Sequence, residues 1–268
     1  MDSSALLHLA VKAALVAGED IMKVYKTDFS FERKSDNTPV TLADRAASKS
    51  IVEALSASGI PSISEEETLP EFEIRKTWER VWIIDPLDGT KEFIKKNGEF
   101  TVNIALIHKH MPVIGVIYAP VWNKLYFASC ELGSFLVETS ELTALLSFNE
   151  LLKTAQKLPL QKTPAIYTLV ASRSHLSHEI NQRMQQIKSI YGEVNLIHAG
   201  SSIKQCWVAE GRAHEYSRLG TTMEWDTAAG QCILEQAGCS LNTFDTNRPL
   251  NYNKENPENP FFIARNLN

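Results

Sequence analysis

A short apolar strand that runs directly into two carboxylates is the feature that most constrains this sequence. The run Val81–Ile84 is typical of a buried strand, and the run Asp85–Thr90 follows it without a spacer. Pro86 lacks an N–H group and Gly89 permits unusual backbone angles, so we predict that the strand ends in a tight bend. Whatever fold the chain adopts must therefore place acidic side chains at the end of a buried strand.

This bend can bring several oxygen atoms to one point. Asp85 and Asp88 are three residues apart, so both carboxylates and the Leu87 carbonyl can turn towards one Mg²⁺ ion. Gly89 and Thr90 offer N–H groups beside that point, and Thr90 adds a hydroxyl. Asp-Pro and Asp-Gly are also ordinary turn dipeptides, whose carboxylates bond the local backbone. The stretch alone therefore leaves a turn and a metal site both open.

Composition indicates a soluble globular protein. With 268 residues, of which 44% are hydrophobic and 22% charged, the chain can build a large core in one domain or in two intimate halves. The net charge of −5 argues against a general surface for nucleic acid or for anionic membranes. Local cations must therefore attract any anionic ligand.

The cysteines and the N-terminus indicate the compartment. The four cysteines are Cys130, Cys206, Cys232 and Cys239. They lie in apolar surroundings without a Cys-x-x-Cys pair, which favours reduced thiols over disulfides or a zinc site. Charged residues interrupt any signal-peptide core, and no apolar run approaches the ~20 residues of a spanning helix. We expect a cytoplasmic protein without an integral membrane segment.

The first half of the chain predicts helices followed by an antiparallel meander. Apolar spacing predicts a helix from Ser3 or Ser4, as its cap, to about Tyr25, and a second helix from Thr41. Between them we expect a strand over 29–33 and a polar loop that ends at proline 39. The meander is predicted from strand-like runs at 101–107, 113–118, 125–128 and 134–137.

The second half alternates between strands and helices. Strands are expected over 166–171, 194–197, 213–216, 239–242 and 261–264, and helices over 180–187, 203–209 and 227–237. Such alternation favours α/β layers. We therefore divide the chain into an N-terminal half (1–138), a connecting segment (139–164) and a C-terminal half (165–268).

Acidic residues outside the bend complete a recognisable pattern. Glu65 lies in the triplet Glu65–Glu67, and Asp226 lies in the run Glu224–Gly230. Together with the run Val81–Thr90, this pattern resembles the inositol monophosphatase family of metal-dependent, lithium-sensitive phosphatases, and most closely its CysQ-type 3'(2'),5'-bisphosphate nucleotidases. The resemblance extends over 34–238 and is weakest over 139–164. It implies the layered αβαβα sandwich of the inositol monophosphatase and fructose-1,6-bisphosphatase type, with the metal cluster between the halves.

The resemblance also implies which residues bind metal and activate water. Two or three Mg²⁺ ions are expected. The implied ligands are Glu65, Asp85, the Leu87 carbonyl, Asp88 and Asp226, with Asp36 at a further metal site. Asp44 and Thr90 are implied to orient and activate the attacking water, with Glu65 as a further catalytic residue. Gly89, Thr90 and Asp226 are also expected to contact the substrate.

Each of these residues has a structural alternative. Glu65 can belong to a solvated acidic face, and Thr90 can be an ordinary turn residue. Asp226 precedes an apolar helix and suits its N-cap. Asp44 fits a capping pattern with Thr41. The residue types alone leave these alternatives open.

A second group of residues indicates which phosphate ester is cleaved. The run Gly200–Lys204 places a glycine and two serines at a helix start, which suits an anion, although serines also simply cap helices. By resemblance, Ser201, Lys204 and Arg218 hold the second phosphate of a nucleotide, and His175 lies against adenine. Tyr-Ser precedes Arg218 where the family often has proline, which leaves the pose of the arginine open.

The resemblance implies an enzyme that uses Mg²⁺ to hydrolyse the 3'-phosphate of adenosine 3',5'-bisphosphate, giving AMP and phosphate in sulfate assimilation. The 5'-phosphosulfate form is a further expected substrate. The alternatives are an inositol monophosphatase or sugar-bisphosphate phosphatase and, in a different class, a non-catalytic metal- or nucleotide-binding module. No nucleic-acid partner is expected. The sequence leaves open whether the protein is a monomer or a homodimer, and whether it associates peripherally with the inner face of the cell membrane.

Overall fold

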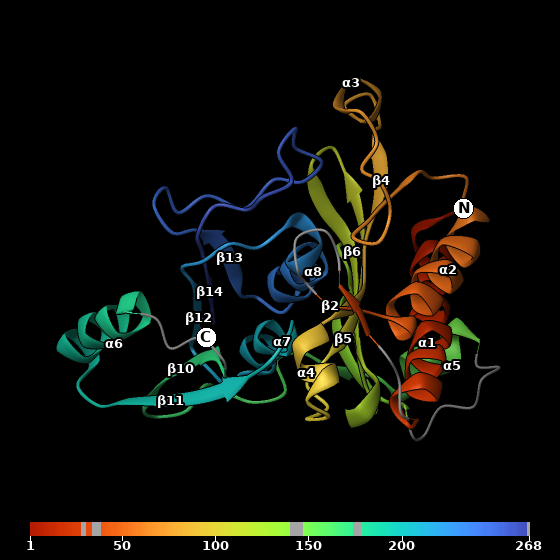
Figure 1. Ribbon diagram of the computed structural model, residues 1–268. Coiled ribbons are helices and arrows are strands. Elements are labelled where there is room, and N and C mark those ends of the chain that lie inside the picture. The colour runs from red at the N-terminus through yellow and green to blue at the C-terminus, as the bar shows by residue number, and fades with distance from the viewer. Residues whose placement is uncertain (28–30, 34–38, 140–146, 174–177, 267–268) are drawn as a thin grey trace.

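The computed structural model describes residues 1–27, 31–33, 39–139, 147–173 and 178–266. Within these residues the strands form a seven-stranded sheet, a five-stranded sheet and a two-stranded hairpin. The large sheet has the order β3-β4-β5-β6-β7-β8-β9, and the small sheet has the order β11-β10-β12-β14-β13 (Figure 1). The hairpin joins β1 (Phe31–Arg33) to β2 (Pro39–Thr41).

The large sheet is a meander with one parallel edge. Its strands are β3 (Ser62–Ser64), β4 (Arg80–Asp88), β5 (Thr101–His108), β6 (Met111–Ala119), β7 (Lys124–Ser129), β8 (Gly133–Glu138) and β9 (Gln156–Lys157). β3 runs parallel to β4, and every later pair is antiparallel. The predicted meander is confirmed. The expected connecting segment contributes α5 (Phe148–Thr154) and then β9 at the sheet edge.

The small sheet carries the predicted alternation. Its strands are β10 (Tyr167–Ser172), β11 (Val194–Ala199), β12 (Glu215–Arg218), β13 (Ser240–Thr243) and β14 (Phe262–Arg265). β11, β10 and β12 are parallel, whereas β14 runs antiparallel to both neighbours. Besides α5, the described helices are α1 (Ser3–Tyr25), α2 (Leu42–Ser56), α3 (Phe72–Arg75), α4 (Thr90–Ile94), α6 (His178–Tyr191), α7 (Ile203–Glu210) and α8 (Ala228–Gln236). The described 3₁₀ turns are η1 (Pro120–Trp122) and η3 (Glu224–Asp226).

Strand β4 shows how the layers are built. Trp82 and Ile84 face the cluster that contains α1 and α2, whereas Val81 and Ile83 face the cluster that contains α7 and α8. Both faces are apolar because both are covered by helices. α7 and α8 lie between the two sheets, and α6 packs on the outer face of the small sheet (Figure 1). The described residues therefore form the expected αβαβα sandwich.

Helix α8 packs closely on the large sheet where β6 has a glycine. A Cβ atom at Gly115 would lie 2.4 Å from the Ala229 carbonyl oxygen and 2.9 Å from the Cys232 Cβ. Such distances are incompatible with a side chain at this position. Gly115 therefore lets the start of α8, directly after Asp226, lie against the sheet that carries Asp85 and Asp88.

Two local predictions were wrong. Asp2, rather than Ser3 or Ser4, caps α1, because its side chain accepts from the Ala5 N–H at 2.7 Å. β4 continues to Asp88, and the bend appears as an irregularity in its pairing with β5 between Asp85 and Asp88. α2 begins at Leu42, directly after Thr41, so Thr41 holds the N-cap position that the capping pattern predicts, and the cap contact itself stays a prediction. No helix in the described parts of the chain is long and apolar enough to cross a membrane.

Candidate active site

Three carboxylates meet between the two halves of the sandwich. Asp85 and Asp88 flank the irregular end of β4, and Asp226 ends the 3₁₀ turn η3 in front of α8. One ligand oxygen from each residue lies within 4.8 Å of the other two. The bend in the chain holds Asp85 and Asp88 close together, and the fold brings Asp226, which is distant in the sequence, next to them.

Asp85 is buried with one oxygen unsatisfied. Its Oδ1 accepts the Leu87 N–H at 3.1 Å, whereas its Oδ2 has no hydrogen-bond partner among the described residues. Burial raises the pKa of Asp85 well above its usual value, and the charges of Glu65, Asp88, Asp226 and Asp44 raise it further. A buried carboxylate with a free oxygen needs a cation or a proton.

Asp226 shows the same excess of negative charge. Burial, followed by the charge of Asp88, raises its pKa to about 8. Its Oδ2 accepts the Met223 N–H at 2.7 Å, and the N-cap of α8 is Thr227. The alternative that Asp226 caps α8 is therefore wrong. These oxygen ligands fit a hard divalent cation such as Mg²⁺.

Two other predicted ligands lie beside this cluster. Glu65 follows β3, and its N–H donates to the Ile84 carbonyl at 3.1 Å, one residue before Asp85. The Glu65 carboxylate does not belong to the group of three, although its charge contributes to the raised pKa of Asp85. The Leu87 carbonyl accepts the Thr90 hydroxyl at 3.4 Å. The metal-binding roles of Glu65 and Leu87 stay predictions.

The residues expected to activate water come from the starts of α2 and α4. Asp44 is in the first turn of α2, is 3% exposed, and raises the pKa of Asp85 through its charge. Thr90 is the first residue of α4 and follows Gly89, whose φ of 94° turns the chain into the helix. Their roles stay predictions. Asp36 and His175 lie outside the described residues.

The loop Gly200–Ser202 before α7, the serine loop, is hydrogen-bonded to Asp88. The hydroxyls of Ser201 and Ser202 donate to Asp88 Oδ2 at 2.8 and 2.7 Å. Ser201 has a φ of 53°, an uncommon conformation for a residue with a side chain. Lys204 is 5% exposed, and its Nζ donates to the Ser201 carbonyl at 2.5 Å. Burial lowers the pKa of Lys204 to about 8.

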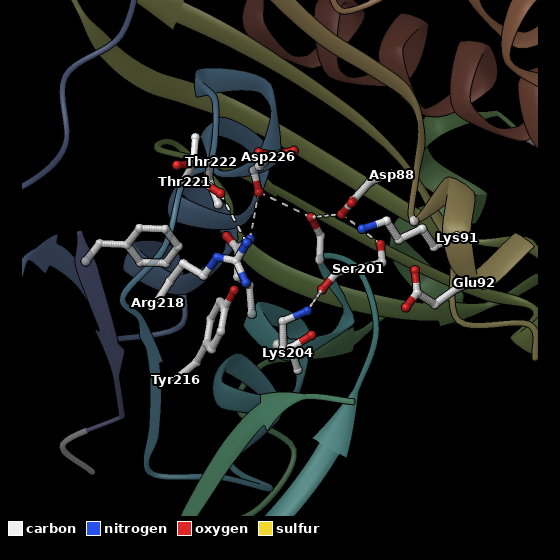
Figure 2. Close-up of a pocket in the computed structure, with 15 residues that line it drawn as sticks. Asp88, Lys91, Glu92, Ser201, Lys204, Tyr216, Arg218, Thr221, Thr222 and Asp226 are labelled. Carbon is white, nitrogen blue, oxygen red and sulfur yellow. Dashed lines mark hydrogen bonds between the residues drawn. The ribbon is translucent and has the colours of Figure 1, made fainter. Parts of the chain in front are cut away.

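A cavity of about 190 Å³ connects the acidic cluster to these cations (Figure 2). Asp88 and Asp226 line it together with Lys204 and Arg218. Arg218, at the end of β12, donates from Nη2 to the Thr221 carbonyl at 3.1 Å, and its buried Nε has no partner among the described residues. Arg218 therefore brings a positive charge to the wall of the cavity.

Sequence reasoning missed several residues at the cavity. Lys91 lines the cavity near Asp88 (Figure 2). Its place directly after Thr90, a predicted site residue, is the sequence feature that could have indicated it. Gln205 also lines the cavity and donates from Nε2 to the Asp226 carbonyl at 2.7 Å. No local sequence pattern links Gln205 to Asp226, because Gln205 belongs to α7 and Asp226 belongs to η3.

Known proteins resemble this chain along almost its whole length. Residues 2–261 match the model of the inositol monophosphatase family. The chain is 41% identical to the 3'(2'),5'-bisphosphate nucleotidase CysQ of Shigella flexneri, over 96% of this chain and 98% of that protein. It is 34% identical to the protein of the same name from Haemophilus influenzae, over 96% and 91%.

Solved structures agree with the sequence comparison. The crystal structure of CysQ from Bacteroides thetaiotaomicron, described as a bacterial member of the inositol monophosphatase family, superposes with a TM-score of 0.91. It is 42% identical and covers 98% of this chain and 97% of its own. The extragenic suppressor protein suhB of Bartonella henselae, at 23% identity and a TM-score of 0.74, shares the fold over 98% of this chain and 94% of its own. With its αβαβα layers and its carboxylates between the two sheets, this chain belongs to the inositol monophosphatase family.

Proposed function

We propose that this chain is a Mg²⁺-dependent 3'(2'),5'-bisphosphate nucleotidase that removes the 3'-phosphate of adenosine 3',5'-bisphosphate and releases AMP and phosphate. The names of the relatives at about 40% identity support this activity. We place the reaction in cytoplasmic sulfate assimilation and extend it to the 5'-phosphosulfate form of the nucleotide. We also expect inhibition by Li⁺.

One observation carries the choice of substrate. A single cavity contains both the carboxylates Asp88 and Asp226 and the cations Lys204 and Arg218. Carboxylates cannot bind a phosphate without a metal, whereas a lysine and an arginine bind one directly. The cavity therefore suits a substrate with two phosphates, one bound through metal at Asp88 and Asp226 and one bound by Lys204 and Arg218.

Space for a nucleoside lies next to this cavity. A second cavity of about 340 Å³ shares Ser172, Tyr216, Arg218 and Thr221 with the first. Ile180 and Leu219 give this cavity an apolar part, which suits a nucleobase better than it suits the hydroxylated ring of an inositol or a sugar. This arrangement favours a nucleotide over inositol phosphate or a sugar bisphosphate.

The protein's own residues supply positioning and charge. Bound Mg²⁺ would neutralise the phosphoryl oxygens and lower the pKa of a water molecule. Asp85, Asp88 and Asp226, together with Glu65 and the Leu87 carbonyl, are the residues that would hold it. Asp44 and Thr90 would accept and orient the proton of the attacking water. Lys204 and Arg218 would hold the phosphate that is not cleaved.

The test is phosphate release from a panel of substrates with Mg²⁺. Adenosine 3',5'-bisphosphate should give the highest kcat/KM, ahead of inositol 1-phosphate and fructose 1,6-bisphosphate. A higher value for either of the latter would exclude the nucleotidase in favour of that phosphatase. If none of them is hydrolysed while Mg²⁺ and the nucleotide still bind, the chain is a binding module.

A further inference from the structure

Each residue of the serine loop, Gly200–Ser202, is hydrogen-bonded by a side chain from the start of β5 or from just before it. Side chains at every second position face the loop, as the period of an extended chain requires. The contacts are Glu99 carboxylate with Gly200 N–H at 2.8 Å, Thr101 Oγ1 with Ser201 Oγ at 2.6 Å, and Asn103 Nδ2 with Ser202 Oγ at 2.9 Å. The large sheet therefore fixes the loop that donates to Asp88.

Glu99 differs from the other two because it contacts two segments. It is 6% exposed, and Oε2 accepts both the Gly200 N–H at 2.8 Å and the Arg173 Nε at 3.0 Å. Arg173 Nη2 pairs with the other carboxylate oxygen and also donates to the His198 carbonyl at 3.2 Å. The ion pair is bidentate, a geometry that fixes orientation as well as distance.

The backbone of Gly200 lies too close to Glu92 and Glu99 for a residue with a side chain. A Cβ atom there would lie 2.8 Å from both the Glu99 carbonyl oxygen and the Glu92 Cγ. Gly200 thus packs directly against Glu92 and Glu99, and the two serines that follow it donate to Asp88.

The second contact of Glu99 leads to the other end of the cavity. Arg173 directly follows Ser172, which ends β10 and lines both the phosphate cavity and the adjoining one. The Glu99 carboxylate therefore contacts both the loop that donates to Asp88 and the residue next to the wall against which we place the nucleoside.

We propose that Glu99 is a positioning residue that couples metal binding to nucleotide binding. Through Gly200 it holds the serine hydroxyls on Asp88, and through Arg173 it holds the nucleotide side of the cavity. The nucleotide half of this inference rests on the proposed function, whereas the metal half does not. Removing the carboxylate leaves a buried N–H without a partner and frees the loop.

Three variants separate the two contacts. Glu99→Ala removes both, Arg173→Ala removes the ion pair, and Glu99→Gln keeps an acceptor for the Gly200 N–H but loses the charge. Lys124→Ala is the matched control, because Lys124 also forms an ion pair between the two halves, at 3.6 Å from Glu210, and neither residue lines the cavity.

Mg²⁺ affinity is measured by calorimetry with the metal alone, and kcat and KM by phosphate release. Glu99→Ala should weaken Mg²⁺ binding by about 10–100-fold, the usual effect of removing a group that orients a ligand. Arg173→Ala and Glu99→Gln should leave Mg²⁺ affinity within about twofold and raise KM for the bisphosphate about tenfold, the lower end of the effect of losing a group that orients a binding residue. Lys124→Ala should change neither quantity.

Equal Mg²⁺ affinity in Glu99→Ala and wild type, with both folded by circular dichroism, would overturn the metal half. An unchanged KM in Arg173→Ala and Glu99→Gln would overturn the nucleotide half. If Glu99→Ala does not fold, these two variants still decide the nucleotide half, and Glu99→Asp, whose shorter side chain withdraws the carboxylate from the Gly200 N–H, replaces Glu99→Ala in the Mg²⁺ titration. Wild-type protein that binds Mg²⁺ but cleaves no nucleotide would refute the proposed function, and the Mg²⁺ titrations would still test Glu99.

Discussion

The Ser202 hydroxyl donates a hydrogen bond to Asp88 Oδ2 at 2.7 Å, across 114 positions of the sequence. Ser202 belongs to the C-terminal half and Asp88 ends a strand of the large sheet. Because two serine hydroxyls use the same oxygen, the other oxygen of Asp88 stays available to a cation. The contact makes the geometry of the acidic cluster depend on how the halves are joined.

Asp85→Asn should abolish Mg²⁺ binding at this cluster and lower kcat/KM at least about a hundredfold, because bound metal supplies several kcal/mol of transition-state stabilisation. Excess chelator should do the same to the wild type. Glu67→Gln, at the exposed end of the glutamate triplet, is the control and should bind normally. Calorimetry and phosphate release measure both effects, and full turnover in chelator would contradict the metal site.

Metal-free protein should lose stability as the pH rises. The pKa of Asp226 is about 8 in the folded state, against an ordinary value of 3.8, so the folded state binds this proton more tightly. The free energy of unfolding therefore falls as the pH rises from about 4 to about 8. Asp226→Asn should flatten this dependence, whereas Asp245→Asn on the exposed C-terminal loop should not. Thermal melts in chelator at pH 6 and pH 8 test the slope.

Lys204→Ala and Arg218→Ala should each lower kcat/KM for adenosine 3',5'-bisphosphate about tenfold to a hundredfold, which corresponds to ~1.5–3 kcal/mol for a charge-assisted contact. With 3'-AMP, which lacks the second phosphate, the loss should be much smaller. The comparison of the two substrates isolates the contact. Equal losses of kcat/KM for both substrates would show that Lys204 and Arg218 stabilise the fold or the metal cluster and do not bind the second phosphate.

Asp44→Asn and Thr90→Ala should each lower kcat by ~10²–10⁴-fold with little change in KM, because a general base acts on the water and not on the ester. Steady-state kinetics at saturating Mg²⁺ measure this split. Near-normal kcat together with a lowered Tm would instead support a capping role for Asp44 or a turn role for Thr90.

Gly115→Ala should destabilise the fold by about 1–3 kcal/mol, since its Cβ would overlap the Ala229 carbonyl oxygen of α8. Moving α8 should also weaken Mg²⁺ binding through Asp226. Gly220→Ala is the control for stability, because its Cβ would make ordinary contacts at 3.9 Å or more. Urea denaturation of both variants gives the comparison, and an unchanged midpoint for Gly115→Ala would show that α8 can move without cost.

The sequence by itself determined the elements and the local half of the site. The apolar runs predicted the strands of the meander, and the alternation after residue 165 predicted the α/β layers, because burial imposes a period on nearby residues. The bend after Ile84 predicted that Asp85 and Asp88 lie together, since three residues of a turn cannot separate them far. Errors such as the cap of α1 concerned neighbouring residues with equal capping ability.

Only the tertiary structure decided which distant residues complete the site. Asp226 joins Asp85 through the packing of α8 on β6, and the serine loop reaches Asp88 across more than a hundred positions. Glu99 contacts Arg173 and Gly200 because β5 lies at the junction of the two halves. A sequence pattern reports neighbours within one turn or strand, whereas the order of strands in a sheet sets which remote side chains meet.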